Sequence, residues 1–297
     1  MKTVEWKMTK EQYGKKIYDL LRSQFHISST VIKMLKNTEN GIQLDGKPAR
    51  VIDRVEEGSI LRLQLPREET VLAQCTLPVP IVYEDEDFLI FNKPAHMPVH
   101  PAHQHQEATL GNVWAYVMEK RLGFTPVFHP INRLDKDTSG LVLCAKHVLA
   151  ASLDPRQVQK RYMAIVSGAL EGKRGIINAP IGMEPGSKVR RAVRPDGRAA
   201  CTHYECLCKN NKYSFISCEL ETGRTHQIRV HMAYLGHPLA GDDLYGGKRD
   251  DIGRQALHCG WMKFIQALLR TWIEVTAPLE EDMMNLLLKE YLCNNDV

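Results

Sequence analysis

The first 70 residues carry two kinds of apolar pattern. Apolar side chains recur at helical spacing in 17–21 and again in 31–35, and both stretches predict short helices. Apolar and polar residues alternate in 42–45 and 60–65, which is the pattern of half-buried strands. Residues 1–70 are therefore predicted to form a small module of ααβ type.

The next stretch, residues 71–87, has the composition of a linker. Leu77–Pro80 contains two prolines, and Glu84–Asp87 is an unbroken acidic run. Prolines interrupt regular structure, and a run of like charges is usually solvated. We expect a connecting segment that ends in an exposed acidic turn.

Residues 88–297 mix strand-like and helix-like patterns. Strands are expected at 88–92, 140–145, 162–167 and 213–220, and helices at 110–121, 226–235 and 279–291. Because helices do not follow the strands in regular turn, a doubly wound parallel sheet fits poorly. The predicted fold class is α+β, with a mixed, largely antiparallel sheet in 88–297.

Composition narrows the class of protein without identifying it. Of the 297 residues, 43% are hydrophobic and 25% charged, which excludes collagen-like, coiled-coil and mostly disordered chains. The net charge of +4 is small, so any binding of nucleic acid has to come from local patches. The longest stretch without a charged residue, Thr70–Tyr83, is too short for a membrane span. We expect a cytoplasmic, monomeric protein with no membrane contact.

A cluster of cysteines and a histidine raises the possibility of zinc. Cys201, His203, Cys206 and Cys208 lie within eight residues, but the segment has the pattern of a strand. Alternation along a strand would put Cys201 and His203 on the face opposite Cys206 and Cys208. No metal site is therefore expected there. The loop histidines at 96, 100, 103 and 105 are expected to be solvated rather than metal ligands.

Two segments could display reactive groups. Asn132–Gly140 gathers ionic and hydroxyl side chains directly before an apolar strand, where a rigid scaffold often presents functional residues. A surface turn capped by Thr138 or Ser139 is an equal alternative from the residues alone. Thr222–His231 places two arginines and two histidines at the start of a predicted helix, which favours an anion.

A third segment, Ser187–Arg198, is a basic loop. Its cations are Lys188, Arg190, Arg191, Arg194 and Arg198, against the single acid Asp196. Such a density of cations suits contacts with a phosphate backbone, although many loops of this kind are only solvated. We predict that this loop contacts RNA or DNA.

The sequence from Arg133 to Leu141, Arg-Leu-Asp-x-x-Thr-Ser-Gly-Leu, resembles the signature of the RluA family, the large-subunit-type RNA pseudouridine synthases. Further ordered matches are Asn92-Lys93-Pro94, Lys160–Tyr162, Gly223–His231 and Gly236–Gly246. Residues 14–65 are weakly similar to a small RNA-binding module found in a ribosomal protein. The resemblance implies the pseudouridine synthase fold, isomerisation of uridine in RNA, and no cofactor.

The resemblance also implies roles for particular residues. Asp135 would be the essential carboxylate, acting as a nucleophile toward the ribose or the base, or as a base on a sugar proton. Arg229 would pair with Asp135 and keep it ionised. Tyr162 would stack on the target base, Arg133 would fill the space that the flipped nucleotide leaves, and Val230 would pack against the base.

The implied partner is RNA, with ribosomal RNA as the first expectation and tRNA as the second. Arg224 joins the basic loop as a predicted RNA contact. Asn132 stands where the family often has histidine, and we expect it to support the loop or the RNA rather than the chemistry. The alternative function is a non-catalytic RNA-binding or RNA-folding protein on the same scaffold.

Overall fold

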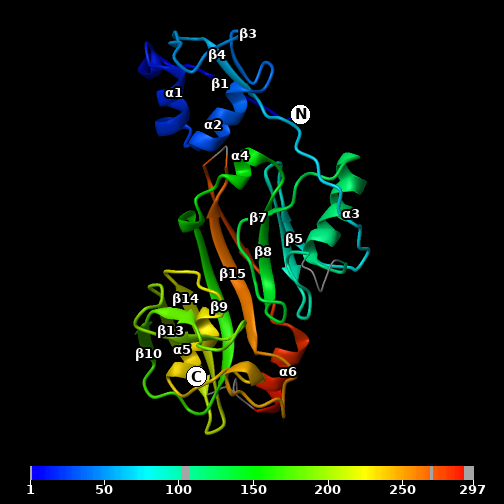
Figure 1. Cartoon of the computed structure of the whole chain (residues 1–297), viewed down its shortest axis with the longest axis vertical. Helices are drawn as coiled ribbons and strands as arrows, with labels where there is room; N and C mark the ends of the chain where they lie inside the picture. Colours follow the sequence, from blue (N-terminus) through cyan, green and yellow to red (C-terminus); the bar gives the residue numbers. More distant parts are fainter. Residues whose placement is uncertain (1, 102–106, 268–269, 291–297) are drawn as a thin grey trace.

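The computed structural model describes residues 2–101, 107–267 and 270–290. Figure 1 shows an elongated molecule, with the N-terminal module at one end and a long sheet running through the rest. The α+β class and the mixed, largely antiparallel sheet agree with the sequence prediction. His103, His105 and the end of the predicted helix at 279–291 lie outside the described residues.

The N-terminal module is a four-stranded sheet packed against short helices. Its strands, in the order β1-β4-β2-β3, are β1 (Thr3–Lys7), β4 (Ile60–Gln64), β2 (Ile42–Leu44) and β3 (Lys47–Pro48). Its helices are α1 (Ile17–Asp19), which continues as the π-helix Leu20–Gln24, α2 (Ser29–Lys36), and a 3-10 turn at Lys10–Gln12. Ser28 caps α2, since its hydroxyl accepts the amide of Val31 at 3.2 Å. The predicted helices and strands are present, whereas β1 was not foreseen because charged residues interrupt its apolar positions.

The large sheet runs in the order β10-β13-β14-β9-β15-β8-β6-β5, with β16 beside β15 and β7 beside β8. Its strands are β5 (Ile81–Glu84), β6 (Phe88–Lys93), β7 (His129–Pro130), β8 (Ser139–Ala145), β9 (Val158–Ser167), β10 (Arg174–Asn178), β13 (Cys201–Lys209), β14 (Tyr213–Leu220), β15 (Leu257–Ile265) and β16 (Trp272–Thr276). β11 (Ile181–Met183) and β12 (Arg191–Val193) form a separate hairpin. Every pairing in the large sheet is antiparallel except the short parallel contact of β15 with β8.

Helices cover the sheet at several points (Figure 1). They are α3 (Leu110–Leu122), α4 (Val148–Ala151), α5 (Gln227–Tyr234) and α6 (Glu281–Lys289), with 3-10 turns at Pro155–Gln157 and Asp243–Tyr245. Every residue of β8 is buried, which is why this strand has a continuous apolar run instead of an alternating one. Among the helices of the described segments, none is long and apolar enough to span a membrane.

Part of the segment assigned to a linker belongs to the sheet. Ile81–Glu84, within the predicted linker 71–87, is strand β5 and pairs antiparallel with β6. The prolines at 78 and 80 precede this strand and therefore do not interrupt it. The connection between the module and the sheet is accordingly shorter than the sequence suggested.

The acidic run is also not a solvated turn throughout. Asp87 is fully buried, and its carboxylate contacts His147 Nε2 at 2.9 Å and Lys2 Nζ at 3.5 Å. The Asp85 carboxylate accepts the amides of Asp87 and Phe88, which bends the chain inward at this point. Burial raises the pKa of Asp87, but His147 and Lys2 outweigh burial and leave it below its ordinary value. The run therefore connects the N-terminal module to the sheet.

Gly140 permits the close contact between the two halves of the large sheet. Its φ is +113°, and it lies opposite Cys259 in the parallel pair of β8 and β15. A Cβ at this position would lie 2.6 Å from the backbone nitrogen of Cys259. Only glycine fits both the backbone conformation and the space.

We expect Gly140→Ala to lower the free energy of unfolding by more than about 2 kcal/mol, because the strands would have to separate. Gly253→Ala is the matched control, since its Cβ would meet no atom within 4 Å. That control should stay within about 0.5 kcal/mol of the parent in urea unfolding. Equal unfolding midpoints for the two variants would contradict the proposed constraint.

Candidate active site

The loop 131–138, directly before β8, is held to the sheet by an asparagine. The side chain of Asn132 donates to the carbonyl of Leu141 at 3.0 Å and accepts the amide of Leu143 at 2.9 Å. These two side-chain bonds take the place of backbone hydrogen bonds that a neighbouring strand would make with β8. These contacts show Asn132 supporting the loop, which is one of the two roles expected of it.

Two buried cations hold the other side of the same loop. Lys93 is fully buried and donates to the carbonyl of Lys136 at 3.0 Å, as well as to Pro94 and Met97. Burial lowers the pKa of Lys93 to about 7. Arg254, 2% exposed, donates to the carbonyl of Asp137 at 3.1 Å. Both cations bind backbone carbonyls of the loop, and neither pairs with the carboxylate of Asp135.

The carboxylate of Asp135 faces a buried arginine. Arg229, in the first turn of α5, donates through Nη1 to Asp135 Oδ2 at 3.1 Å. The opposite edge of the guanidinium makes a bidentate pair with Asp242, Nε to Oδ2 at 2.7 Å and Nη2 to Oδ1 at 2.8 Å. The side chain of Asp242 is fully buried, whereas that of Asp135 is 28% exposed. The predicted Asp135–Arg229 pair is present, and the third member, Asp242, was missed.

This arrangement sets the charge state of the arginine. Burial alone would lower the pKa of Arg229, but Asp242 and then Asp135 outweigh it and raise the pKa above its ordinary value. The guanidinium thus stays charged and fixed in direction, with one face toward Asp135. The sequence offered a signal for Asp242, since it lies in the Gly236–Gly246 match, but nothing in the residues indicated its partner.

His226 is a second group beside Asp135 that sequence reasoning did not assign. Its Nε2 lies 3.8 Å from Asp135 Oδ2, and its Nδ1 lies 2.8 Å from the hydroxyl of Tyr245. That hydroxyl also accepts the amide of Arg191 at 3.0 Å, so Tyr245 links His226 to the backbone at Arg191. Burial lowers the pKa of His226, which favours the neutral ring at pH 7.

The Asp135 carboxylate lines a cleft beside this cluster. It has a volume of about 1080 Å³ and includes Arg133, Asp135, Tyr162 and Arg224 in its walls. An adjoining pocket of about 70 Å³ shares these four residues and adds Arg229. Apolar side chains of Leu220, Ile228 and Leu257 complete the adjoining pocket. The cleft and this pocket together combine a carboxylate, an aromatic ring and apolar side chains.

Tyr162 and Arg133 occupy different depths of the cleft. Tyr162 is 7% exposed on β9, opposite Cys259, and burial raises the pKa of its hydroxyl well above the ordinary value. Arg133 is exposed, and among the described residues it makes no ion pair. Its exposed side chain thus lines the cleft without an ion-pair partner in the described part of the chain. The positions of both residues are compatible with their predicted roles.

Val230 was predicted to line the base pocket, and its position contradicts this. It is 3% exposed and packs with Ile181, Ala200 and Tyr245, away from the residues of the cleft. The pocket is lined by Gln227, Ile228 and Arg229 of α5, and Val230, the next residue, is not among its lining residues. Ile228 provides the apolar contact with the pocket instead.

The basic loop forms the hairpin of β11 and β12, next to the cleft rather than in it. Lys188, Arg190 and Arg198 are exposed, Arg194 pairs with Asp196 at 2.7 Å, and Arg191 is half-buried against Met183. The amide of Arg191 binds the Tyr245 hydroxyl, so this hairpin is joined to His226. Arg224, by contrast, lies in the cleft wall and donates to the carbonyl of Ala199 at 2.9 Å.

Comparisons with known proteins show which family model and which relatives this chain resembles. A family model described as RNA pseudouridylate synthase matches residues 87–234. An uncharacterized RNA pseudouridine synthase of Bacillus subtilis, YjbO, is 40% identical over 88% of this chain and 94% of its own length. A ribosomal large subunit pseudouridine synthase D of Xanthomonas campestris is 36% identical over 82% of this chain and 79% of its own length.

A solved structure agrees with these sequence matches. The structure titled human RNA pseudouridylate synthase domain containing 1 aligns with a TM-score of 0.56 and 26% identity, over 70% of this chain and 86% of that one. The matched segment 87–234 contains Asp135, Tyr162 and Arg229, but ends before Asp242.

The two acids around Arg229 should differ in their effect on stability. Asp242→Ala leaves a buried guanidinium without its bidentate partner and should cost about 3 kcal/mol or more of unfolding free energy. Asp135→Asn leaves that bidentate pair intact and should cost less than about 1 kcal/mol. Urea unfolding of both variants measures the difference, and equal losses would show that Asp242 does not carry the neutralisation.

Proposed function

This chain belongs to the RNA pseudouridylate synthase family, whose members are isomerases acting on uridine in RNA, and from this premise we propose that Asp135 is its essential carboxylate and ribosomal RNA its substrate. The observation that carries the proposal is the meeting of Asp135, Arg229 and Tyr162 in one cleft. Relatives named for the ribosomal large subunit support ribosomal RNA over tRNA.

Asp135 has the surroundings that the reaction needs. Attack on the ribose or base and removal of a sugar proton both require an ionised carboxylate. Arg229 donates to it at 3.1 Å and places a positive charge beside it. Its second edge is held by Asp242, so the charge beside Asp135 does not move during turnover. A fixed charge of this kind adds no reorganisation cost to the chemical step.

The remaining residues of the cleft handle the nucleotide. Tyr162 stacks on the target base, an interaction worth about 1–3 kcal/mol. Arg133 fills the gap that the extruded uridine leaves, since base flipping itself costs a few kcal/mol. Ile228, Leu220 and Leu257 surround the detached uracil with apolar surface, which keeps water out and retains the base for reattachment through carbon 5.

A non-catalytic RNA-binding protein is the alternative function. The exposed edge of Asp135 argues against it, because a carboxylate in a cleft for RNA repels phosphates and contributes nothing to binding alone. A chain that only bound RNA would also gain nothing from a second acid that fixes the arginine beside it.

Asp135→Asn should reduce turnover by more than about 100-fold while leaving the Kd for RNA within a few-fold of the parent. The assay is tritium release from RNA labelled at carbon 5 of uridine, with ribosomal RNA and tRNA supplied separately. Asp137→Asn is the matched control on the same loop, since its carboxylate pairs with the exposed His96 at 2.8 Å. That variant should retain turnover.

Each outcome has a definite meaning. Release by the parent from ribosomal RNA, lost only in Asp135→Asn, supports the proposal. Release from tRNA alone would overturn the substrate, and full activity of Asp135→Asn would overturn the role of the carboxylate. Absence of release from both pools would favour the RNA-binding alternative.

The hairpin contributes the phosphate contacts in this proposal. Replacing the exposed Lys188, Arg190 and Arg198 by alanine should weaken RNA binding and reduce the slope of log K against log salt by about 0.7–0.9 per lost phosphate contact. Arg191 stays in place because its side chain is half-buried. Filter binding at several salt concentrations measures the slope.

A triple variant with the same loss of charge provides the control. Lys173, Arg174 and Lys289 are exposed and lie outside the cleft lining, so their replacement by alanine should leave the slope nearly unchanged. Equal slopes for the two triple variants would mean that the hairpin does not contact RNA.

A further inference from the structure

Three different metal-ligating groups converge where β13 begins and β14 ends. Cys201 and His203 lie on the same face of β13, and Glu221 follows β14 directly, with its amide on the carbonyl of Cys201 at 3.2 Å. The sulfur, imidazole nitrogen and carboxylate oxygen of these residues all lie within 4.8 Å of one another. Strand alternation separates Cys206 and Cys208 from this face, but the neighbouring strand supplies an oxygen ligand that the sequence did not reveal.

The distances suit a tetrahedral ion. Zinc binds sulfur at about 2.3 Å and imidazole nitrogen at about 2.0–2.1 Å, which separates the two ligands by about 3.6 Å at a tetrahedral angle. Cys201 Sγ and His203 Nε2 are 3.6 Å apart. His203 Nε2 and Glu221 Oε1 are 2.6 Å apart, in hydrogen-bond contact. The Glu221 side chain is 63% exposed, so it has room to withdraw by the fraction of an ångström that a metal requires.

We propose that Cys201, His203 and Glu221 form a binding site for a divalent transition metal of the zinc class, with water in the fourth position. A thiolate and an imidazole favour zinc over magnesium, calcium or manganese, which prefer oxygen ligands alone. On coordination the metal replaces the thiol proton of Cys201, which leaves to solvent, and the imidazole of His203 binds through Nε2 with its proton on Nδ1. No electron is transferred in this step.

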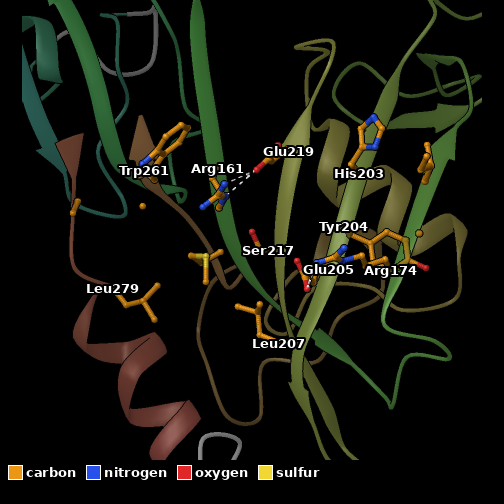
Figure 2. Close-up of a pocket in the computed structure, with 15 residues that line it drawn as sticks. Arg161, Arg174, His203, Tyr204, Glu205, Leu207, Ser217, Glu219, Trp261 and Leu279 are labelled. Carbon is orange, nitrogen blue, oxygen red and sulfur yellow. Dashed lines mark hydrogen bonds and ion pairs between the residues drawn. The ribbon is translucent and has the colours of Figure 1, made fainter. Parts of the chain in front are cut away.

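The neighbouring acid on the same face is not a member of the site. Glu219 pairs with Arg161, with Nη2 and Oε1 2.8 Å apart. Figure 2 shows His203, Glu219 and Arg161 on adjacent strands around a cavity of about 850 Å³, with His203 at its rim. An ion can therefore reach His203 from solvent, while the carboxylate of Glu219 is already neutralised. Glu219 thus provides a matched control.

The site adjoins residues 222–229, the segment that contains Arg224 and Arg229. Thr222 accepts the amide of Cys201 at 3.1 Å, and Gln227 joins the carbonyl of Cys201 to the amide of Arg224. A metal would replace the hydrogen bond between His203 and Glu221 with coordination bonds, next to the start of this segment. It would also raise the local charge by one unit beside the cleft, which favours an approaching phosphate if the proposed function holds.

The test uses the full-length reduced protein, stripped with a chelator, and does not depend on catalysis. Zinc is titrated in competition with a chromophoric chelator, and cobalt(II) is added separately as a spectroscopic probe. The parent should bind one zinc with a Kd below about 10 μM, with a thiolate-to-cobalt absorption band in the near ultraviolet. Cys201→Ser should abolish that band and weaken zinc binding at least tenfold.

Further variants separate the site from nonspecific binding. His203→Ala and Glu221→Gln, both at exposed side chains, should each weaken zinc binding at least tenfold without loss of fold by circular dichroism. Glu219→Gln should bind as the parent does. Failure to saturate at 100 μM zinc, a cobalt spectrum without a thiolate band, or equal affinity in Cys201→Ser would each overturn the proposal.

Discussion

A buried positive charge must be neutralised, and the whole site depends on how Arg229 meets this requirement. Asp242 takes the inner edge of the guanidinium through two short hydrogen bonds, and Asp135 meets the outer edge at a single longer one. The division is unequal because only Asp242 is fully buried. Asp242 is thus the buried acid that neutralises Arg229, and Asp135 keeps a partly exposed carboxylate at which chemistry can occur.

The polar side chains that hold the loop around Asp135 also bind away from its carboxylate. Lys93, Arg254 and Asn132 all bind backbone atoms of the loop or of β8 instead of the Asp135 carboxylate. The backbone of the loop is thus fixed by groups that do not contact the Asp135 carboxylate, which is the kind of support that a precisely placed functional group requires. The zinc-class site proposed at Cys201 lies beside the segment leading to α5, which it would stabilise.

Local patterns predicted most of the elements and part of the site. The buried run of β8 and the helix of Arg229 follow from residue spacing, and Asn132, Asp135, Tyr162 and Arg229 followed from ordered motifs. Partners far apart in the chain could not be derived in this way. Asp242 and Tyr245 acquire their roles only from contacts with Arg229 and His226 that tertiary structure creates.

The failures have equally local causes. Val230 packs against Ile181, Ala200 and Tyr245 instead of lining the cleft, a difference that a linear motif does not express. Asp87 lies in an acidic run that resembles a solvated turn, yet Lys2 and His147 neutralise it from elements distant in sequence. Charge runs indicate exposure only when no cation folds back onto them.

The pairing of Arg254 with Asp282 has a consequence for the order of events during synthesis. Arg254 reaches the loop of Asp135 through the carbonyl of Asp137, while its own charge is balanced by Asp282 at the start of α6, at 2.6 Å. A nascent chain that has not yet exposed α6 lacks that balance. The support that Arg254 gives to the loop around Asp135 is therefore complete only after α6 has been synthesised and has packed against it.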